Sequence, residues 1–301
     1  MRCIFLYNPN SGKGKVQKKL PLIKKKLSAC FDEVVICAAH SAEDLERKVR
    51  GSTKIFDVVV FSGGDGTFNN VLQGLGNTDA QLGYIPAGTV NDVARSLHIP
   101  RSIKGALKVI EQKHSERLDC MTVNGASYAM YIAAAGAFTS ATYHTPQTTK
   151  RALGALAYAV ECMKHNMKLD VFRIEAACDG KKVDTHAVLV LILNGRSVAG
   201  FPINKEGSMR DGSLEMVIIK QVRKPGFFRK LGAYLSVFSV FLFGCRIKKK
   251  DIVFLRGEKI DIRTEENVVW DFDGEEGIRG NISIEATRGR VKLYVPRGKI
   301  I

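Results

Sequence analysis

Apolar runs and amphipathic stripes alternate over the first 120 residues of the chain. Two stripes with i, i+3, i+4, i+7 spacing, beginning at Phe68 and at Val90, are typical of helices that bury one face. Further helices are expected around Ile23 and over residues 41–50, with Ser41 as the N-cap of the latter. Four short apolar runs without polar alternation predict strands that are covered on both faces, at residues 3–7, 34–38, 57–61 and 82–86. This alternation predicts a doubly wound parallel α/β sheet.

From about residue 119 the apolar pattern favours strands. Only residues 152–163 and 227–243 have convincing helical patterns. The expected strands cover residues 128–135, 171–178, 187–194, 214–220, 252–255, 259–263, 267–272 and 282–286, and a last one at 290–295 is expected to return to the first domain. The sequence therefore predicts an α/β domain, residues 1–118 with 288–301, and a β-rich domain, residues 119–287.

The charge of the chain is concentrated in two segments. Its 301 residues include 46 Lys and Arg against 30 Asp and Glu, which gives a formal net charge of +16. Residues 13–26 hold seven lysines and residues 220–250 hold nine Lys or Arg, with no acidic residue in either window. Together the basic residues of these two windows account for the formal net charge of +16. Two solvated lysine-rich faces would explain them, but the excess also favours a polyanion: an anionic membrane, a phosphorylated small molecule or nucleic acid.

An aromatic run lies inside the second basic window. Five of the 15 phenylalanines fall within residues 227–243. A buried helix or a strand hairpin would explain this run. The alternative is an interfacial segment whose aromatic side chains enter the lipid boundary while flanking Lys and Arg meet phosphates. The run is shorter than the ~20 residues of a membrane-spanning helix, and nucleic acid is disfavoured because base-stacking aromatics alternate with polar groups.

The cysteines indicate the compartment. There are seven, and none is in CxxC spacing with another, so neither a disulfide framework nor a zinc cluster is expected. The N-terminal apolar run ends at Asn8, which is too early for a signal peptide. We therefore expect a cytoplasmic protein. The interfacial interpretation of residues 227–243 would place it peripherally on the inner face of the membrane.

Glycine-bearing loops follow three predicted strands of the first domain, at residues 8–14, 62–67 and 87–89. The carboxyl ends of parallel strands meet at one sheet edge, and glycines there let backbone N–H groups approach an anion. The loops therefore favour a polyphosphate, although they match neither GxGxxG nor the Walker-type GxxxxGK[ST]. Asp65, between two glycines, would repel phosphates unless a cation such as Mg²⁺ intervenes. Alternatively, it caps the helix that follows.

Three segments make the interpretation more specific: NPNSG at 8–12, GGDGTFN at 63–69 and PAGTVNDVAR at 86–95. With LHIP at 97–100, Asp-Gly at 211–212 and Asp-Gly-Glu at 273–275, they resemble the diacylglycerol kinase catalytic family, and most closely its soluble bacterial branch of DgkB-type and YegS-type lipid kinases. The resemblance spans most of the chain. It implies an α/β nucleotide-binding domain followed by a β-sandwich domain that completes the active site. It also implies an ATP-dependent lipid kinase that phosphorylates diacylglycerol to phosphatidic acid with Mg²⁺.

The resemblance further implies roles for individual residues. Asp65 would hold the catalytic Mg²⁺, and Glu275 would be the general base, with Glu276 as the adjacent alternative. ATP would contact Asn8, Pro9, Asn10, Ser11, Gly12, Gly63, Gly64, Asp65, Gly66, Thr67, Phe68, Asn69 and Thr89. A structural Mg²⁺ would be held by Asp211 with backbone oxygens of Ser208 and Ser213, although Arg210 stands where family members often have Asp. Dimerisation of the chain is a family-level expectation.

Other functions remain open at this point. The acceptor could equally be ceramide, a sphingoid base, phosphatidylglycerol or a polyprenol. NAD kinases share the GGDGT motif but would not explain residues 86–92 or 273–275. A basic nucleic-acid-binding module, or a catalytically inactive relative that binds lipid, would explain the charge alone. The chain has no zinc-finger or RNP-like pattern that would support binding to nucleic acid.

Overall fold

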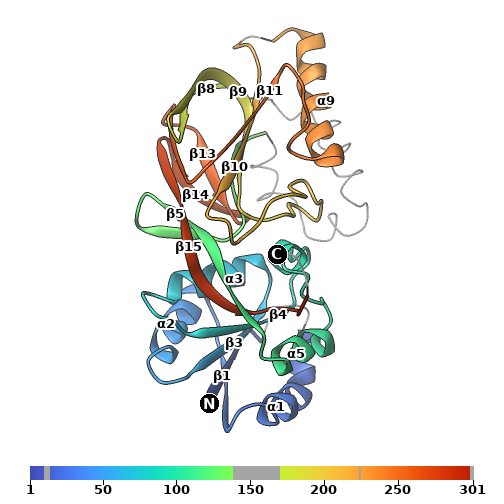
Figure 1. Cartoon of the computed structure of the whole chain (residues 1–301), viewed down its shortest axis with the longest axis vertical. Helices are drawn as coiled ribbons and strands as arrows, with labels where there is room; N and C mark the ends of the chain where they lie inside the picture. The colour runs from blue at the N-terminus through green and yellow to red at the C-terminus, as the bar shows by residue number, and fades with distance from the viewer. Residues whose placement is uncertain (10–13, 138–169, 224, 299–301) are drawn as a thin grey trace. The chain divides into compact units, whose positions relative to one another are not determined.

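The computed structural model describes residues 1–9, 14–137, 170–223 and 225–298 of the chain. The chain divides into two compact units, unit 1 with Met1–Cys120 and Arg288–Ile301, and unit 2 with Met121–Thr287 (Figure 1). The helix expected at residues 152–163 lies outside the described residues.

Unit 1 is built on a parallel sheet. Its strands are β1 (Arg2–Tyr7), β2 (Glu33–Ala38), β3 (Val58–Gly63) and β4 (Gln81–Pro86), arranged in the order β2-β1-β3-β4. All their pairings are parallel, and the far end of β15 (Ile282–Tyr294) joins β4 in the same direction, with Leu293 opposite Leu82. The sheet is therefore the predicted parallel one, and its final strand comes from the last part of the chain.

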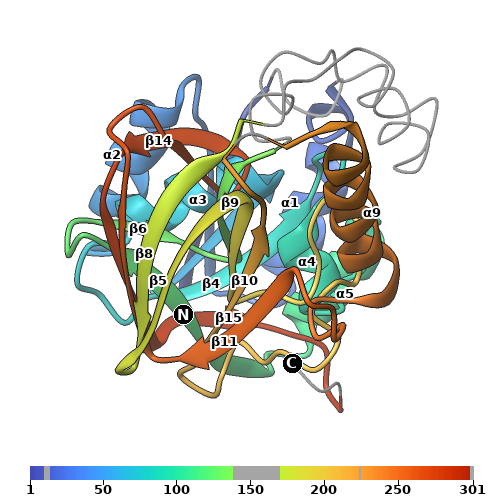
Figure 2. The ribbon, with the colours of Figure 1, turned by 90° about the horizontal axis from the view of Figure 1, so that it is seen from above.

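Helices cover both faces of this sheet. Figures 1 and 2 show α2 (Ala42–Ser52) and α3 (Asp65–Gly74) on one side of the strands and α1 (Leu20–Ser28) and α5 (Ile103–Glu111) on the other. The hydroxyl of Ser41 accepts a hydrogen bond from the Asp44 N–H at the start of α2, which confirms the predicted cap. Pro21 lies in the first turn of α1, directly after the 3₁₀ turn η2 (Gln17–Lys19), where its missing N–H costs nothing.

Three aromatic rings fix α3 to the sheet. Phe68 on α3 meets Phe61 of β3 and Tyr84 of β4 edge to face, with ring centroids 5.2 Å apart in both pairs. All three side chains are buried. Burial of each such ring contributes about 1.5–3 kcal/mol, so this cluster positions the start of α3 firmly over the ends of β3 and β4.

Unit 2 is antiparallel and β-rich, as expected. Seven of its strands follow the order β14-β13-β7-β9-β8-β12-β15, while β10 pairs with β9 and β11 and β6 pairs with β5. The bounds are β5 (Ser115–Val123), β6 (Ser127–Ala129), β7 (Ile132–Gly136), β8 (Phe172–Cys178), β9 (Lys181–Leu193), β10 (Leu214–Lys220), β11 (Ile252–Gly257), β12 (Lys259–Thr264), β13 (Val269–Phe272) and β14 (Glu275–Arg279). The core contains Trp270, which is fully buried and donates its indole N–H to the Gly280 carbonyl at 2.8 Å.

Three features differ from the sequence expectations. The strands expected at 282–286 and 290–295 form one continuous strand, β15, which runs through residues 287–289 although Gly289 has a left-handed φ of 60°. The expected strand at 128–135 is two strands, separated at Met130 and Tyr131. Strands β5 and β14 and helix α5 were not expected. The β14 sequence EEGIR has a single large apolar residue, Ile278, and all five residues are exposed, so it carries no apolar alternation.

Candidate functional site

The carboxyl edge of the unit 1 sheet brings two of the glycine loops together. Because β3 and β4 are parallel neighbours, their following loops leave from the same edge. The Gly63 carbonyl accepts hydrogen bonds from the Ala87 N–H at 2.8 Å and the Gly88 N–H at 3.2 Å. Asn8 and Pro9 follow β1 at this edge, whereas Asn10, Ser11 and Gly12 lie outside the described residues.

Glycines are required where these two loops meet. A Cβ on Gly88 would lie 2.4 Å from the Gly64 Cα, and one on Gly64 would lie 3.1 Å from the Gly88 Cα. The two backbones are therefore in contact, which no larger residue permits. A Cβ on Gly63 would lie 2.1 Å from the Thr67 hydroxyl oxygen, so this position is also confined to glycine. Such loops expose backbone N–H groups to an anion at a helix N-terminus.

Asn91, which the sequence reasoning did not single out, fixes the second loop. Its side chain accepts a hydrogen bond from the Gly88 N–H and donates one to the Gly88 carbonyl, both at 2.9 Å. Asn91 is left-handed, with φ 56°, a conformation that Asn tolerates better than most residues. The buried Tyr84 hydroxyl donates to the Gly63 carbonyl at 3.1 Å, and burial raises the pKa of Tyr84 well above its usual value, so it remains a neutral donor. Asn91 lies within the PAGTVNDVAR segment, which was the available signal.

Asp65 occupies the first position of α3 and does not cap that helix, whose N-cap is Gly64. Its carboxylate instead accepts a hydrogen bond from the Val93 N–H, at 3.0 Å, in the first turn of α4 (Asp92–Ser96). Helix α4 has no side-chain cap of its own, because the Asn91 side chain is turned to Gly88. Asp65 is thus held between the N-termini of two helices, which stabilises a negative charge there.

The other predicted nucleotide residues have mixed surroundings. Phe68 is fully buried in the aromatic cluster, so its side chain serves packing and does not reach a ligand. Asn69 accepts a hydrogen bond from the Gln73 side chain at 3.0 Å. The Thr89 carbonyl accepts one from the Arg101 guanidinium at 2.7 Å. Gly66 and Thr67 lie in the first turn of α3.

In unit 2, a buried carboxylate locks the turn that carries Glu275. Asp273 is 3% exposed and accepts hydrogen bonds from three consecutive N–H groups, those of Met130 at 2.6 Å, Tyr131 at 2.9 Å and Ile132 at 3.2 Å. Asp273 and Gly274 form the turn itself with positive φ, and Glu275 is the first residue of β14. Glu275 therefore lies at the start of a strand, directly after a rigid turn.

The two adjacent glutamates differ in their partners. Glu276 forms an exposed ion pair with Arg279, at 3.7 Å. The Glu275 carboxylate makes no hydrogen bond or ion pair with another described residue. Partial desolvation of its carboxyl, followed by the charge of Asp271, raises the pKa of Glu275 above its ordinary value of 4.5. A carboxyl group with a raised pKa is better suited to accept a proton near neutral pH than one held in an ion pair.

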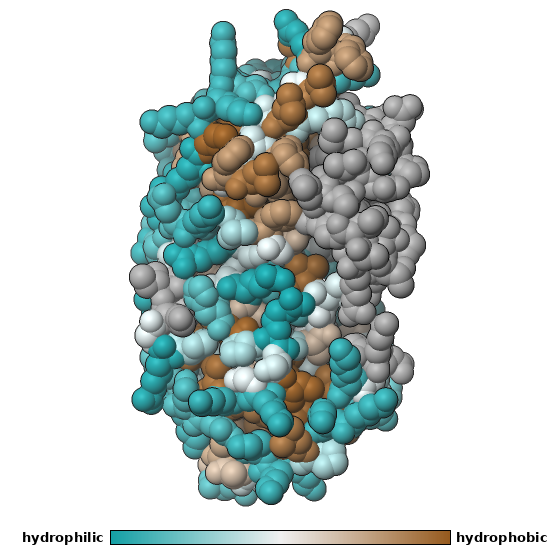
Figure 3. Space-filling view, turned by 90° about the vertical axis from the view of Figure 1, so that its right-hand side faces the viewer, coloured by the Kyte–Doolittle hydropathy of each residue, from teal (hydrophilic) through white to brown (hydrophobic). Residues whose placement is uncertain are grey.

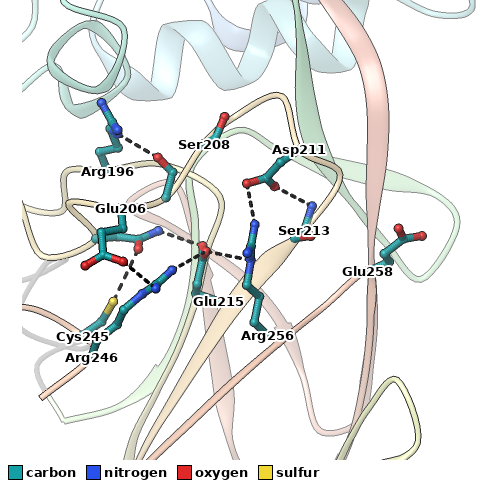
Figure 4. Close-up of polar contacts among 12 residues, drawn as sticks. Arg196, Glu206, Ser208, Asp211, Ser213, Glu215, Cys245, Arg246, Arg256 and Glu258 are labelled. Atoms are coloured by element: carbon teal, nitrogen blue, oxygen red, sulfur yellow. Dashed lines mark hydrogen bonds and ion pairs between the residues drawn. The ribbon is translucent and has the colours of Figure 1, made fainter. Parts of the chain in front are cut away.

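The third predicted site, around Asp211, is occupied by guanidinium groups (Figure 4). One oxygen of Asp211 accepts from the Ser213 N–H at 3.0 Å, and the other accepts from the Arg256 Nη2 at 2.6 Å. The Ser208 hydroxyl accepts from the Arg210 N–H at 3.3 Å. Arg256 was not expected here, and the 45 residues that separate it from Asp211 leave no local sequence signal.

The residues present fit the two expected cations differently. In the described part of the chain, no group of three or more His, Cys, Asp or Glu side chains is placed to hold a metal ion. At Ser208, Asp211 and Ser213 a guanidinium already binds the carboxylate, so the predicted structural Mg²⁺ does not fit this arrangement. A nucleotide-bound Mg²⁺ needs only one or two carboxylates besides the phosphates, and Asp65, which is held at the start of α3 by the Val93 N–H, fits that requirement.

Helix α9 (Phe227–Phe243) is neither a strand hairpin nor a fully buried helix. Its buried face consists of small residues, among them Ala233, Ser236 and Ser239, and it contacts β10. Its outer face exposes six large apolar side chains: Phe227 at 75%, Phe228 at 83%, Phe243 at 69%, and also Leu231, Leu235 and Leu242. Figure 3 shows apolar side chains gathered along this face. None of the helices among the described residues is long and apolar enough to cross a membrane.

The fold and these loops define a two-domain kinase of the lipid kinase type. The family model "Diacylglycerol kinase catalytic domain" matches residues 2–123, and "YegS C-terminal NAD kinase beta sandwich-like domain" matches residues 132–295. The expected combination of an α/β domain and a β-sandwich domain is thus confirmed.

Similar proteins identify the family. A diacylglycerol kinase of Bacillus subtilis is 32% identical over 282 residues, which cover 92% of this chain and 90% of that protein. A diacylglycerol kinase of Staphylococcus aureus is 30% identical over 280 residues, covering 92% of this chain and 86% of that protein. The chain belongs to the diacylglycerol kinase family.

Solved structures share the fold. The structure of a diacylglycerol kinase from Bacillus anthracis superposes with a TM-score of 0.79 at 22% identity, covering 100% of this chain and 98% of that chain. Another structure from the same organism gives a TM-score of 0.83 at 24% identity, covering 100% of this chain and 96% of that chain. The overall fold predicted from the sequence is therefore that of known structures.

Proposed function

We propose that the protein transfers the γ-phosphoryl group of ATP to the free hydroxyl of diacylglycerol and so forms phosphatidic acid, with Mg²⁺ as the metal ion. The observation that carries the proposal is the backbone contact between Gly64 and Gly88 at the carboxyl edge of unit 1, in a chain whose relatives over 92% of its length are named diacylglycerol kinase. Two glycine loops held this closely would let a polyphosphate approach the N-terminus of α3, where the partial positive charge of the helix favours an anion.

Positioning and charge neutralisation are the main requirements of phosphoryl transfer. In this proposal the loops after β1, β3 and β4 hold the phosphates, and Asn91 keeps the Gly88 loop in place. Asp65 would hold the Mg²⁺, which neutralises charge on the phosphate oxygens when bound. The hydrogen bond from Val93 fixes the Asp65 carboxylate before any ligand arrives.

The proposed general base is Glu275. As the acceptor hydroxyl attacks the γ-phosphorus, its proton passes to the Glu275 carboxylate while the bond to ADP breaks. The lock on Asp273 keeps Glu275 at the end of a rigid turn, and its raised pKa favours proton uptake near neutral pH. Glu276 is less suitable because it is paired with Arg279.

Two substitutions test these roles. Glu275→Gln should reduce kcat by at least about 10²-fold, the typical contribution of a general base, while ATP affinity stays within a factor of two. Asp65→Ala should lose Mg²⁺-dependent turnover. Glu276→Gln is the matched control and should keep near-normal activity. Normal turnover in Glu275→Gln, or a large loss in Glu276→Gln, would remove Glu275 from the mechanism.

We also propose that α9 docks the protein on an anionic membrane at the inner face, where diacylglycerol resides. The exposed aromatic face of α9 lies between basic residues that include Arg229, Lys230 and Lys248 to Lys250. Exposed apolar area costs about 25 cal/mol per Å² in water, and a lipid interface removes that cost. The flanking cations add electrostatic attraction to anionic headgroups.

Vesicle binding tests this docking. Cosedimentation with vesicles that contain anionic phospholipid should exceed that with neutral vesicles and should weaken at high salt. Phe227→Ala combined with Phe228→Ala should lower the bound fraction several-fold. Ile55→Ala, which removes another exposed apolar side chain in unit 1, is the control and should leave it unchanged. Equal binding to neutral vesicles at high salt would contradict the electrostatic contribution.

The acceptor is settled by a phosphoryl-transfer assay with radiolabelled ATP in mixed micelles. The panel should contain diacylglycerol, ceramide, a sphingoid base, phosphatidylglycerol, a polyprenol and NAD. We expect diacylglycerol to give the highest kcat/KM. If another lipid is labelled preferentially, the protein is a lipid kinase with a different acceptor. Labelling of NAD alone would contradict the proposal.

A further inference from the structure

We infer that Arg256 takes the place of a divalent cation at the Asp211 turn, so that unit 2 holds this turn with guanidinium groups and needs no metal ion for its stability. The inference concerns the architecture of unit 2 and does not depend on which substrate the kinase phosphorylates. Ser208, Asp211 and Ser213 were predicted to hold a Mg²⁺, but the Asp211 carboxylate instead accepts hydrogen bonds from the Ser213 N–H and the Arg256 guanidinium.

Arg256 bridges two carboxylates. Its Nη2 lies 2.6 Å from one oxygen of Asp211, and its Nε lies 3.3 Å from Oε1 of Glu215. Glu215 is 1% exposed, and its other oxygen accepts a hydrogen bond from the Asn204 side chain at 2.8 Å. A carboxylate buried to this degree is stabilised by a nearby positive charge, and Arg256 lies within ion-pair distance of both Glu215 and Asp211. The compensation at Glu215 is partial, because its Oε1 has no hydrogen-bond partner among the described residues and desolvation raises its pKa.

The strand register puts Arg256 in this position. In the antiparallel pairing of β10 with β11, Glu215 and Arg256 are direct cross-strand partners. Directly opposed residues on one face have Cβ atoms about 5 Å apart, so the backbone itself brings the guanidinium to the buried carboxylate. Asp211 precedes β10 by only three residues and reaches the same guanidinium. The position of Arg256 beside Glu215 and Asp211 is therefore determined by the strand pairing as well as by its side-chain conformation.

Two more arginines hold the neighbouring residues of the same segment (Figure 4). Arg246 Nη1 lies 2.6 Å from the Glu206 carboxylate, and Arg246 Nη2 lies 3.9 Å from Glu215. Arg196 donates through Nε to the Gly207 carbonyl at 2.8 Å. Carboxylates and a backbone carbonyl are the ligand types that a hard cation such as Mg²⁺ would use. Here guanidinium groups, whose fixed fork of donors suits carboxylates, bind all of them.

Metal binding to the nucleotide-free protein tests the inference directly. Mn²⁺, which can be followed by electron paramagnetic resonance, should bind the wild type and Asp211→Asn with the same stoichiometry and affinity. The melting temperature of the wild type should not change when EDTA replaces Mg²⁺. A Mn²⁺ site that Asp211→Asn removes, or a fall in melting temperature on adding EDTA that is absent in Asp211→Asn, would overturn the inference.

Substitution of the arginine gives the second test. Arg256→Met keeps most of the side-chain volume but removes the charge, so the melting temperature should fall by several degrees with or without Mg²⁺. Arg263→Met is the matched control, because Arg263 lies exposed on β12 and makes no hydrogen bond or ion pair with another described residue. Equal melting temperatures for the two variants would overturn the role of Arg256. If Arg256→Met does not fold, Arg256→Lys, which keeps one charge without the fork, should show an intermediate loss.

Discussion

The loops of unit 1 and the turns of unit 2 are fixed by different kinds of groups. At the carboxyl edge of unit 1 the contacts that hold the Gly63–Gly64 and Gly88 loops come from backbone atoms, the Asn91 amide and the neutral Tyr84 hydroxyl. In unit 2 the corresponding task is done by ionised groups, with Asp273 on three N–H groups and Arg256 between two carboxylates.

The difference follows from the proposed roles of the two regions: the unit 1 loops bind phosphates, whereas the unit 2 turns only have to be rigid. Negative charges lining a phosphate site would repel the ligand, so neutral clamps are compatible with binding, and Asp65 is the exception that fits a cation. The turns of unit 2 need rigidity and face no such constraint. Their buried carboxylates are held by hydrogen bonds and ion pairs, which offset part of the cost of burial, whereas an unpaired charge would cost several kcal/mol. Substitutions should therefore have larger effects on folding in unit 2 and larger effects on nucleotide affinity in unit 1.

The largest effect is expected for Asp273→Ala. It leaves the N–H groups of Met130, Tyr131 and Ile132 without their acceptor in a buried setting. At about 1–3 kcal/mol for each orphaned group, and with partial relaxation, the free energy of unfolding should fall by about 3–5 kcal/mol, measured by guanidinium denaturation. Asp273→Asn, which keeps an acceptor oxygen, should lose less. A loss below about 1 kcal/mol for the alanine variant would mean that the turn is fixed by other contacts.

An intermediate effect is expected for Gly88→Ala. The added methyl would lie 2.4 Å from the Gly64 Cα and 2.7 Å from the Asn91 Oδ1, so the two loops must separate. Overpacking of this kind costs about 1–3 kcal/mol, and ATP affinity measured by calorimetry should fall at least tenfold. Gly51→Ala in α2 is the control, because nothing lies within 4 Å of its added methyl. Unchanged ATP affinity in Gly88→Ala would show that the contact between Gly64 and Gly88 is not needed for ATP binding.

The smallest effect is expected for Asp44→Asn, which removes a surface carboxylate from unit 1. Hydrogen bonds from the Lys48 side chain and the His40 N–H lower the pKa of Asp44 from 3.8 to about 2. Because the folded-state pKa is the lower one, its stabilising contribution is present above pH 4 and is lost as the pH falls towards 2. The small difference in melting temperature between wild type and Asp44→Asn should therefore shrink between pH 5 and pH 3. Glu46→Gln in the same helix serves as the control, and a difference that grows on acidification would contradict the assignment.

The parts of the fold that depend on local pattern could be predicted from the sequence. The buried runs of unit 1 and the stripe beginning at Phe68 gave the parallel sheet and α3, and residues 227–243 form a helix with those bounds. Strand β14 could not be predicted in this way because all five of its residues are exposed and Ile278 is its one large apolar side chain. The continuity of β15 could not be predicted either. Gly289 suggests a break between two strands, but β15 pairs with β5 and runs on through this residue.

In the candidate site, too, residues in local motifs could be predicted and residues with distant partners could not. Motifs made Asp65, the glycines and Glu275 candidates, and the close contact of the two loops explains why glycines stand at positions 64 and 88. The groups that position them are distant in sequence. Asp273 meets residues 130–132 more than 140 positions away, and Arg256 meets Asp211 across 45. A single sequence shows such residues only as an ordinary turn aspartate and an ordinary strand arginine, since their partners are defined by sheet register.

The pairing of β15 with β4 has a consequence for how the protein is made. Gln81 and Lys292, which are 211 residues apart in the chain, are joined by a side-chain hydrogen bond where these strands meet. At a synthesis rate of about 5–20 residues per second, β4 leaves the ribosome roughly 10–40 s before its neighbour exists. During that interval the nascent chain carries an open strand edge, which is a template for wrong pairing and aggregation. Chaperone binding during translation should therefore concentrate on this stage, and slowing elongation after β4 should lower the yield of folded enzyme.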